Sequence, residues 1–269
     1  MLIEPAQANG HSAFAERCLS NGSRPLMQNR VNGWQSSVTR PRNQVLAGLP
    51  AEVWGRIAPH LNQTLLIPGK VLIPEGKPVE RVYFPNCGVL SLLMCGRFGE
   101  RVESGLTGRD SMAGGFEAMS MAPSVTRATV QIAGTACWMS AAAFRSELNW
   151  GGGCQDRLLG IFQEQFAYAA QYALCNRFHC VEERLSRWLL RVCDYVDNSE
   201  IFITHEAIAQ VLGTRRSGVT VALSTLEKAG IVTCGRGRLA VLDHAALQSR
   251  ACECYTALQS HTQSHKSRS

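Results

Sequence analysis

Four polar and basic residues follow a glycine turn between two predicted helices. They are Arg215, Arg216, Ser217 and Thr220, on the first turn and a half of a helix predicted from about residue 215 to residue 229. Arginine is the side chain that most often binds O6 and N7 of guanine, and the start of a recognition helix lies nearest the base edges. Two arginines at a helix start oppose the helix dipole, which favours an external anion as their partner. The alternative is a solvated helix start without a partner.

The two predicted helices have clear boundaries in the sequence. We expect the first helix to begin at Thr204, whose side chain caps backbone N–H groups, and to end at Gly213, because glycine adopts positive φ at low cost. The second helix is expected to end at Gly230. Four apolar residues at helical spacing are expected to bury its inner face: Val219, Ala222, Leu223 and Leu226.

A predicted hairpin with two further arginines follows the second helix. The segment IVTCGRGRLAVLD gives two strands joined by Gly235–Gly237, with Arg236 at the tip and Arg238 beside it. A glycine-flanked tip allows close approach to the sugar-phosphate backbone, so both arginines are expected to contact phosphate. Helix, glycine turn, helix and basic hairpin are the plan of a winged helix-turn-helix. The candidate DNA-binding residues are Thr204, Thr214, Arg215, Arg216, Ser217, Thr220, Arg236 and Arg238.

Upstream of this unit, the pattern predicts short strands and then helix. Residues 63–139 contain short apolar runs separated by glycine and proline, which favours an antiparallel sandwich or barrel of the size of one small roll. Before them, a short amphipathic helix is expected within residues 46–61. Its apolar face would consist of Leu46, Leu49, Val53, Ile57 and Leu61.

The region from Arg157 to Val196 predicts one long helix, or two helices joined near His179. An apolar stripe with steps of three or four residues runs along it. The stripe comprises Leu158, Phe162, Phe166, Ala169, Ala173, Asn176 and Cys180. We expect it to join two copies of the chain in a homodimer, the alternative being packing within one chain.

Composition excludes several classes of protein. The 269 residues are 45% hydrophobic and 18% charged, which suits a globular chain and not a wholly disordered one. No window of 18 uncharged apolar residues predicts a membrane span, and no secretory signal is visible, so a cytoplasmic location and no membrane partner are expected. The formal net charge of +6 is compatible with nucleic-acid binding.

The eleven cysteines are scattered and odd in number. In a chain without a visible export signal this favours reduced thiols, most of them packed as small hydrophobes. The closest pair is Cys252-x-Cys254, and no two Cys-x2-Cys units occur, so no metal site and no cofactor are predicted. Redox sensing by one of the cysteines and a metal site with unrecognised spacing are the alternatives.

These residues carry a resemblance to a known family. The stretch from Ile203 to Val232, with the strand behind it, resembles the Crp-type winged helix-turn-helix, and residues 68–130 resemble the cyclic-nucleotide-binding β-roll. The order of roll, long helix and winged helix is similar to that of the Crp/Fnr family of bacterial transcription regulators. The resemblance implies an α+β fold and a homodimer on a two-fold symmetric promoter site in double-stranded DNA, with RNA polymerase as a candidate partner. The resemblance covers roughly residues 46–250, and composition predicts a disordered arm before it and a flexible tail after it. The predicted division is a disordered arm over 1–43, a cyclic-nucleotide-binding-like β-roll sensor domain over 44–150, a long dimerisation helix and hinge over 151–196, the winged helix-turn-helix over 197–255 and a flexible tail over 256–269.

The resemblance also implies an effector site in the roll, with departures from the family pattern. Arg127 matches the family arginine at the cyclic phosphate, but Ala128 stands where a serine is usual. Gly114, Gly115 and Glu117 match the family glycine and acid only loosely. These departures argue against cyclic AMP as the effector, whose identity stays unknown. In the second helix, Ser217 and Val221 replace two charged residues of the family, which implies a different DNA site.

Two other classes of function were weighed. An enzyme would need a nucleophile with a base, a carboxylate pair or a phosphate loop, and the motifs Gly-x-Ser-x-Gly, His-Glu-x-x-His and Walker A do not occur, so no enzymatic activity is predicted. A ligand- or redox-sensing module that acts through a protein partner is the alternative to a DNA-binding regulator. Salt-dependent binding to DNA distinguishes the two.

Overall fold

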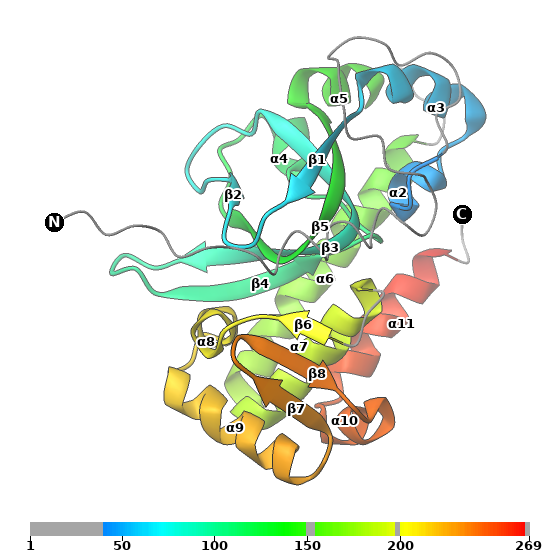
Figure 1. The fold of residues 1–269 in the computed structure, drawn as a ribbon. Helices are drawn as coiled ribbons and strands as arrows, with labels where there is room; N and C mark the ends of the chain where they lie inside the picture. The colour runs from blue at the N-terminus through cyan, green and yellow to red at the C-terminus, as the bar shows by residue number, and fades with distance from the viewer. Residues whose placement is uncertain (1–39, 149–153, 197–199, 267–269) are drawn as a thin grey trace, which may run out of the picture.

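The computed structural model describes residues 40–148, 154–196 and 200–266 (Figure 1). Most of the expected N-terminal arm, residues 1–39, lies outside the described residues. Residues 40–43 were assigned to that arm, but Asn43 is fully buried and its side-chain amide donates to the carbonyls of Pro85 and Ser111, both at 2.9 Å. The folded roll therefore includes residues that were expected to belong to the arm.

An antiparallel roll forms the upper half of the molecule (Figure 1). Its strands lie in the order β1-β5-β3-β4, with β2 paired to β5. The strands are β1 (Asn62–Leu66), β2 (Val71–Ile73), β3 (Arg81–Cys95), β4 (Arg101–Thr107) and β5 (Arg127–Ser140). The prediction of an antiparallel roll in an α+β chain is confirmed.

Two of these strands are longer than the sequence pattern predicted. β3 continues through Gly88, where a turn was expected, because the register shifts on both sides of Cys87 and the extra residues form bulges. Gly88 has φ +84°, and a Cβ atom on Gly134 would lie 2.1 Å from the carbonyl oxygen of Cys87. These glycines therefore mark a close approach of two bent strands, not the end of a strand.

Short helices cover one end of the roll. They are α2 (Gln44–Ala47), α3 (Ala51–Ile57), the 3-10 turn η1 (Ala58–His60), α4 (Gly115–Ser120) and α5 (Ala141–Leu148). The single helix expected within 46–61 is interrupted, because α2 ends at Gly48 and Pro50 begins α3. The apolar face was placed correctly: Leu46, Leu49, Val53 and Ile57 are buried, and Leu61 packs at the edge of the same core.

Two central helices connect the halves of the molecule. α6 (Cys154–Phe178) and α7 (Val181–Tyr195) meet at Cys180, so the option of two helices joined near His179 is the one observed. Glu183 stabilises the start of α7 by accepting a 2.8 Å hydrogen bond from the backbone N–H of Cys180. α7 packs against α9 and α10 with its leucines fully buried within the chain.

The C-terminal half has the predicted winged-helix plan. It contains β6 (Glu200–Phe202), α8 (His205–Leu212), α9 (Arg216–Lys228), β7 (Val232–Gly235), β8 (Arg238–Val241) and α10 (His244–Arg250). The hydroxyl of Thr204 accepts a 3.1 Å hydrogen bond from the N–H of Ala207, and Gly213 ends α8 with φ +57°. Both predicted ends of the first helix are confirmed.

The last segment corrects an expectation. Residues 256–269 were expected to form a flexible tail, but α11 (Cys254–Lys266) continues through most of them and lies along α6 (Figure 1). Leu258 is fully buried against Tyr168 and Tyr172 of α6. The polar sequence of this segment did not indicate a helix, because its first described turns bury only Tyr255 and Leu258 as large apolar side chains.

One hydrophobic core joins roll, central helix and winged helix. Val89, Leu106 and Ile132 of the roll share a cluster with Trp188 of α7 and with the inner side chains of α8 and α9. At the same junction β4 packs against α8, and the side chain of Val102 on β4 lies next to Gly213 at the end of α8. None of the helices within the described ranges is long and apolar enough to cross a lipid bilayer.

Candidate nucleic-acid interface and sensor site

Helix α9 has one buried face and one exposed polar face. The predicted inner residues Val219, Ala222, Leu223 and Leu226 are all buried. The opposite face exposes the side chains of Arg215, Arg216, Ser217, Thr220 and Val221. The surface at the start of α9 is thus basic and polar, with one apolar side chain, Val221, that is 67% exposed.

Neither arginine at the start of α9 has an ion-pair partner within the part of the chain that the structure describes. Arg215 is the N-cap residue of α9, and no side chain caps the helix there. The free backbone N–H groups and both guanidinium groups therefore present positive charge to solvent at one point. This arrangement is suited to binding a large anion.

The threonines of the candidate site have local structural partners. Thr204 caps α8, and Thr214 is half-buried in the turn between the helices. The hydroxyl of Thr220 donates to the carbonyl of Arg216 and lies 3.1 Å from Nδ1 of His205 on α8. The contact between Thr220 and His205 joins α9 to α8, and Thr220 is the more exposed of the two residues.

The two wing arginines differ from one another. Arg236 is exposed at the hairpin tip and has no ion-pair partner among the described residues. Arg238 forms an ion pair with Glu200 of β6 and lies over the ring of Phe202, 5.4 Å from its centroid. Both arginines were expected to contact phosphate. In the structure Arg238 is paired with a carboxylate of β6, whereas Arg236 is exposed and can contact an external anion.

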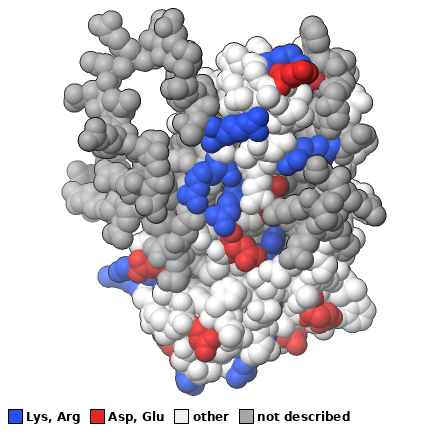
Figure 2. Space-filling model, turned by 90° about the vertical axis from the view of Figure 1, so that its right-hand side faces the viewer, with Lys and Arg blue, Asp and Glu red and all other residues white. Residues whose placement is uncertain are grey.

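Figure 2 shows the side of the molecule on which α3 and α11 lie in Figure 1. Basic side chains gather on the upper half of this face, over the roll. The lower half, where Figure 1 shows α10 and α11, carries scattered charges of both signs on a mostly uncharged surface. The start of α9 lies on the other side of the molecule, so this face is not the one that presents its arginines.

In the roll, the candidate effector arginine already has an anionic partner. The guanidinium of Arg127 donates two hydrogen bonds to the carboxylate of Glu75, at 2.6 and 2.5 Å. This bidentate contact lowers the pKa of Glu75 to about 2, so Glu75 is ionised at neutral pH. The sequence pattern does not mark Glu75 as a site residue, although it lies within residues 68–130, which resemble the β-roll.

The other candidate effector residues line the same end of the roll. Ala128 is buried on β5, opposite Leu92, where it offers no polar atom. Gly114 has φ +83°, and a Cβ there would press against Ile73 and Val79. Gly115 is buried against Met112, whereas Glu117 accepts a 3.1 Å hydrogen bond from Ser124, next to the Arg127 strand. The candidate effector residues are therefore neighbours in the roll. The two glycines, however, are explained by close packing against the side chains beside them.

A buried carboxylate lies where the roll meets the central helices. Glu103 of β4 accepts hydrogen bonds from Ser91 at 2.5 Å, Tyr172 of α6 at 3.1 Å and Trp188 of α7 at 3.5 Å. Burial raises the pKa of Glu103 to about 7, against the hydrogen bonds and the charge of Arg187, which lower it. No spacing in the sequence marks this residue.

Sequence analysis also missed a group of side chains that are distant in sequence. Cys175 of α6 and His179, which directly follows that helix, meet Cys252 from the link between α10 and α11 and Cys254, the first residue of α11. A hydrogen bond from Cys252 lowers the pKa of Cys175 to about 5, and the charge of Arg187 adds to this effect. The spacing of Cys175 and His179, one helical turn apart, was the available signal.

The fold and the exposed start of α9 define a roll-and-winged-helix protein with a helix-turn-helix of the DNA-binding type. Residues 183–250 match the family model of the Crp-like helix-turn-helix domain, beginning inside α7. A search of curated protein sequences finds no match to the chain.

Several solved structures share the fold of the chain. FixK2 from Bradyrhizobium japonicum is 16% identical, with a TM-score of 0.61 over 71% of this chain and 98% of that one. A CRP-family transcriptional regulator from Thermus thermophilus is 17% identical, with a TM-score of 0.57 over 70% and 96%. The c-di-GMP-responsive regulator CLP from Xanthomonas campestris is 14% identical, with a TM-score of 0.56 over 72% and 100%. The chain therefore has a Crp-like helix-turn-helix domain and the Crp/Fnr fold, which confirms the resemblance.

Proposed function

We propose that the protein is a transcription regulator that binds a palindromic promoter site as a homodimer, with α9 in the major groove. The observation that carries this proposal is the exposed start of α9, where Arg215 and Arg216 have no anionic partner among the described residues. An unpaired pair of guanidinium groups at the positive end of a helix is a site for an anion. DNA is the anion that this domain type binds.

The exposed face of α9 supports separate roles for its residues. Arg216, on the first turn, is proposed to bind a guanine, and Val221 to contact a thymine methyl group. Arg236 at the wing tip is proposed to contact phosphate, which adds affinity without sequence preference. Regulation from such a site would involve RNA polymerase as a further partner.

The exposed face of α6 supports the homodimer. Phe166 and Phe178 are 75% and 73% exposed, and Leu159 and Leu174 are also exposed, with Ala169 and Ala173 between them. An apolar face of this length on a water-soluble helix favours a protein partner, and the alanines allow a second copy of α6 to approach closely. The N-terminal end of the expected stripe differs, because Leu158 is buried against the roll of its own chain.

The effector is proposed not to be cyclic AMP. Glu75 holds the guanidinium that would bind the cyclic phosphate, and Ala128 supplies no hydroxyl. A phosphate would have to displace an ionised carboxylate from a bidentate contact. Calorimetry with the purified protein should detect no cyclic AMP binding with a Kd below about 10 μM, a free energy near −7 kcal/mol.

Selection of binding sites from random DNA duplexes tests the proposed function. The full-length protein should enrich a two-fold symmetric sequence with half-site centres about 34–36 Å apart. Binding to that sequence should weaken steeply with salt, because counterions are released from phosphates. Absence of binding even at low salt would refute the proposal and support a sensor that acts through a protein partner.

Sedimentation equilibrium at micromolar concentration tests the homodimer. Ala173→Glu would place a charge against its symmetry mate and should yield monomers. Ala142→Glu, at an exposed alanine of α5, is the matched control and should remain dimeric. A monomeric wild-type protein would refute the dimer while leaving the DNA-binding proposal to the selection experiment.

A further inference from the structure

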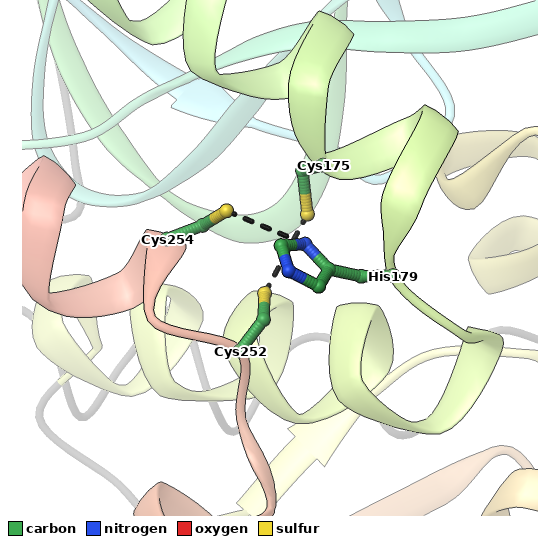
Figure 3. A group of neighbouring side chains, drawn as sticks. All are labelled: Cys175, His179, Cys252 and Cys254. Atoms are coloured by element: carbon green, nitrogen blue, oxygen red, sulfur yellow. Dashed lines mark hydrogen bonds between the residues drawn. The ribbon is translucent and has the colours of Figure 1, made fainter.

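The four side chains Cys175, His179, Cys252 and Cys254 converge on one point (Figure 3). Their donor atoms all lie within 4.8 Å of one another. The sulfur atoms of Cys175 and Cys252 are 3.6 Å apart, and the sulfur of Cys254 is 3.5 Å from Nδ1 of His179. Three cysteines and a histidine form one of the common ligand sets of structural zinc.

Two of the distances between donor atoms match the edges of a tetrahedron around zinc. Zinc–sulfur bonds of about 2.3 Å imply sulfur–sulfur edges of about 3.8 Å, and a zinc–nitrogen bond of about 2.0 Å implies a sulfur–nitrogen edge of about 3.5 Å. The observed edges of 3.6 and 3.5 Å are close to these values. A disulfide would need a sulfur–sulfur distance near 2.05 Å, and all three cysteines are free thiols.

Neighbouring groups orient the ligands from outside. Nε2 of His179 lies 3.1 Å from the carboxylate of Glu253, which leaves Nδ1 to face the sulfur atoms. This carboxylate–histidine contact is the usual support of a histidine that binds a metal. The side-chain amide of Gln171 donates to the sulfur of Cys254 at 3.0 Å.

The charge around the group also favours a metal-thiolate centre. Three thiolates around a divalent ion leave one net negative charge. Arg187, fully buried on α7, interacts electrostatically with Cys175, and two of its nitrogen atoms have no hydrogen-bond partner among the described residues. The nearby Arg184 is also buried and interacts with the same thiol. A metal–thiolate centre with one net negative charge would help to compensate these buried cations.

We propose that Cys175, His179, Cys252 and Cys254 bind one zinc ion in a closed tetrahedral site. The ligands come from the end of α6 and the residue after it, from the link between α10 and α11, and from the first residue of α11. The metal would therefore fasten the C-terminal helix α11 and the adjoining winged helix to α6. Its role is structural, since four protein ligands leave no open position for a substrate.

Metal analysis of the full-length protein, purified under reducing conditions, tests this site. The wild-type protein should contain one zinc ion per chain, and Cys252→Ser and His179→Ala should lose it. Cys234→Ser is the matched control: it removes a half-buried cysteine on β7, outside the group, and should retain the zinc. His179→Cys should also retain it, because it restores a fourth ligand.

A cobalt titration keeps the test valid if a variant fails to fold. The wild-type apoprotein should bind one Co2+ with the visible bands of a tetrahedral thiolate complex and a sulfur-to-cobalt charge-transfer band. Zinc should displace the cobalt, and its removal should lower Tm. A wild-type protein without zinc and without this spectrum, a disulfide between Cys175 and Cys252, iron with acid-labile sulfide, or zinc retained by both Cys252→Ser and His179→Ala would each overturn the proposal.

Discussion

Arg127 of the roll and the arginines at the start of α9 differ in whether their guanidinium groups have an anionic partner within the part of the chain that the structure describes. Arg127 in the roll is held by two hydrogen bonds to Glu75. Arg215 and Arg216 on α9 are exposed and have no ion-pair partner among the described residues. A guanidinium that is paired with a carboxylate gains little by binding an external anion, whereas an unpaired guanidinium gains a new ion pair. The comparison teaches that the arginine alone does not define an anion site, because the neighbouring carboxylate decides its availability.

Among the variants that test this contrast, removal of the Arg216 side chain should have the largest effect on DNA binding. Arg216→Ala should reduce discrimination between the selected site and scrambled DNA by about 1–3 kcal/mol for each half-site, because a base contact is lost twice in a dimer. Equilibrium binding to both DNAs provides the measurement. An equal loss on both sequences would mean that Arg216 contacts phosphate, which would contradict the proposed placement of α9.

The next largest effect concerns Glu103, which lies between the two regions. Its pKa is 4.5 in a solvated chain and about 7 in the fold, so the folded state binds the proton more tightly. The stabilisation from that proton is complete below pH 4.5 and is lost as pH rises to above 7. Glu103→Gln should remove this loss and make the variant more stable than wild type at pH 8, by up to about 3 kcal/mol.

Urea denaturation at pH 5 and pH 8 measures this effect. Glu52→Gln, at an exposed glutamate of α3, is the control and should behave as wild type does at both pH values. If Glu103→Gln instead destabilises the protein at pH 8, then the attraction between Glu103 and Arg187 outweighs the cost of burial.

The two wing arginines should differ in their contributions to the salt dependence of DNA binding, which is a smaller effect. Arg236→Ala should weaken binding to all DNA sequences alike and should lower the slope of log K against log salt by about 1 per phosphate contact. Arg238→Ala should change the slope less, because Arg238 is paired with Glu200. Binding across a salt series compares the two variants. A greater loss of slope for Arg238→Ala would show that DNA displaces Glu200.

The smallest effect is expected at the roll. Glu75→Gln should lower the stability at pH 7 by at most about 1 kcal/mol, because the ion pair with Arg127 is partly exposed to solvent. The pKa of Glu75 is lowered in the fold, so its contribution is present above pH 4.5 and is lost as pH falls toward about 2. Thermal unfolding at pH 7 and pH 3 should show a smaller difference between variant and wild type at pH 3.

Calorimetry with cyclic AMP measures whether Glu75 alone prevents Arg127 from binding the nucleotide. Glu75→Gln frees Arg127 but leaves Ala128 unchanged, so we expect binding of the variant to remain weak. Tight binding by the variant alone would identify the carboxylate as the sole obstacle.

The sequence predicted local features and missed most long-range ones. Thr204, Gly213 and Gly230 marked helix ends correctly, because capping depends on residues adjacent in the chain. The bulges at Gly88 could not be distinguished from turns, since glycine suits both. The ion pair between Glu75 and Arg127, like the cysteine–histidine group, unites residues far apart in sequence, and only the fold reveals such contacts.

The shared core of roll, α7 and winged helix has a consequence for unfolding. Val89 and Trp188 belong to one continuous apolar cluster, and β4 contacts α8 directly. Separating the two halves would expose this cluster to water, so they should melt together in a single calorimetric transition. A small molecule that binds only the roll would then raise the melting temperature of the whole chain, in proportion to RT ln(1 + [L]/Kd). Screening compounds by thermal shift is therefore a route to the effector that needs no promoter sequence.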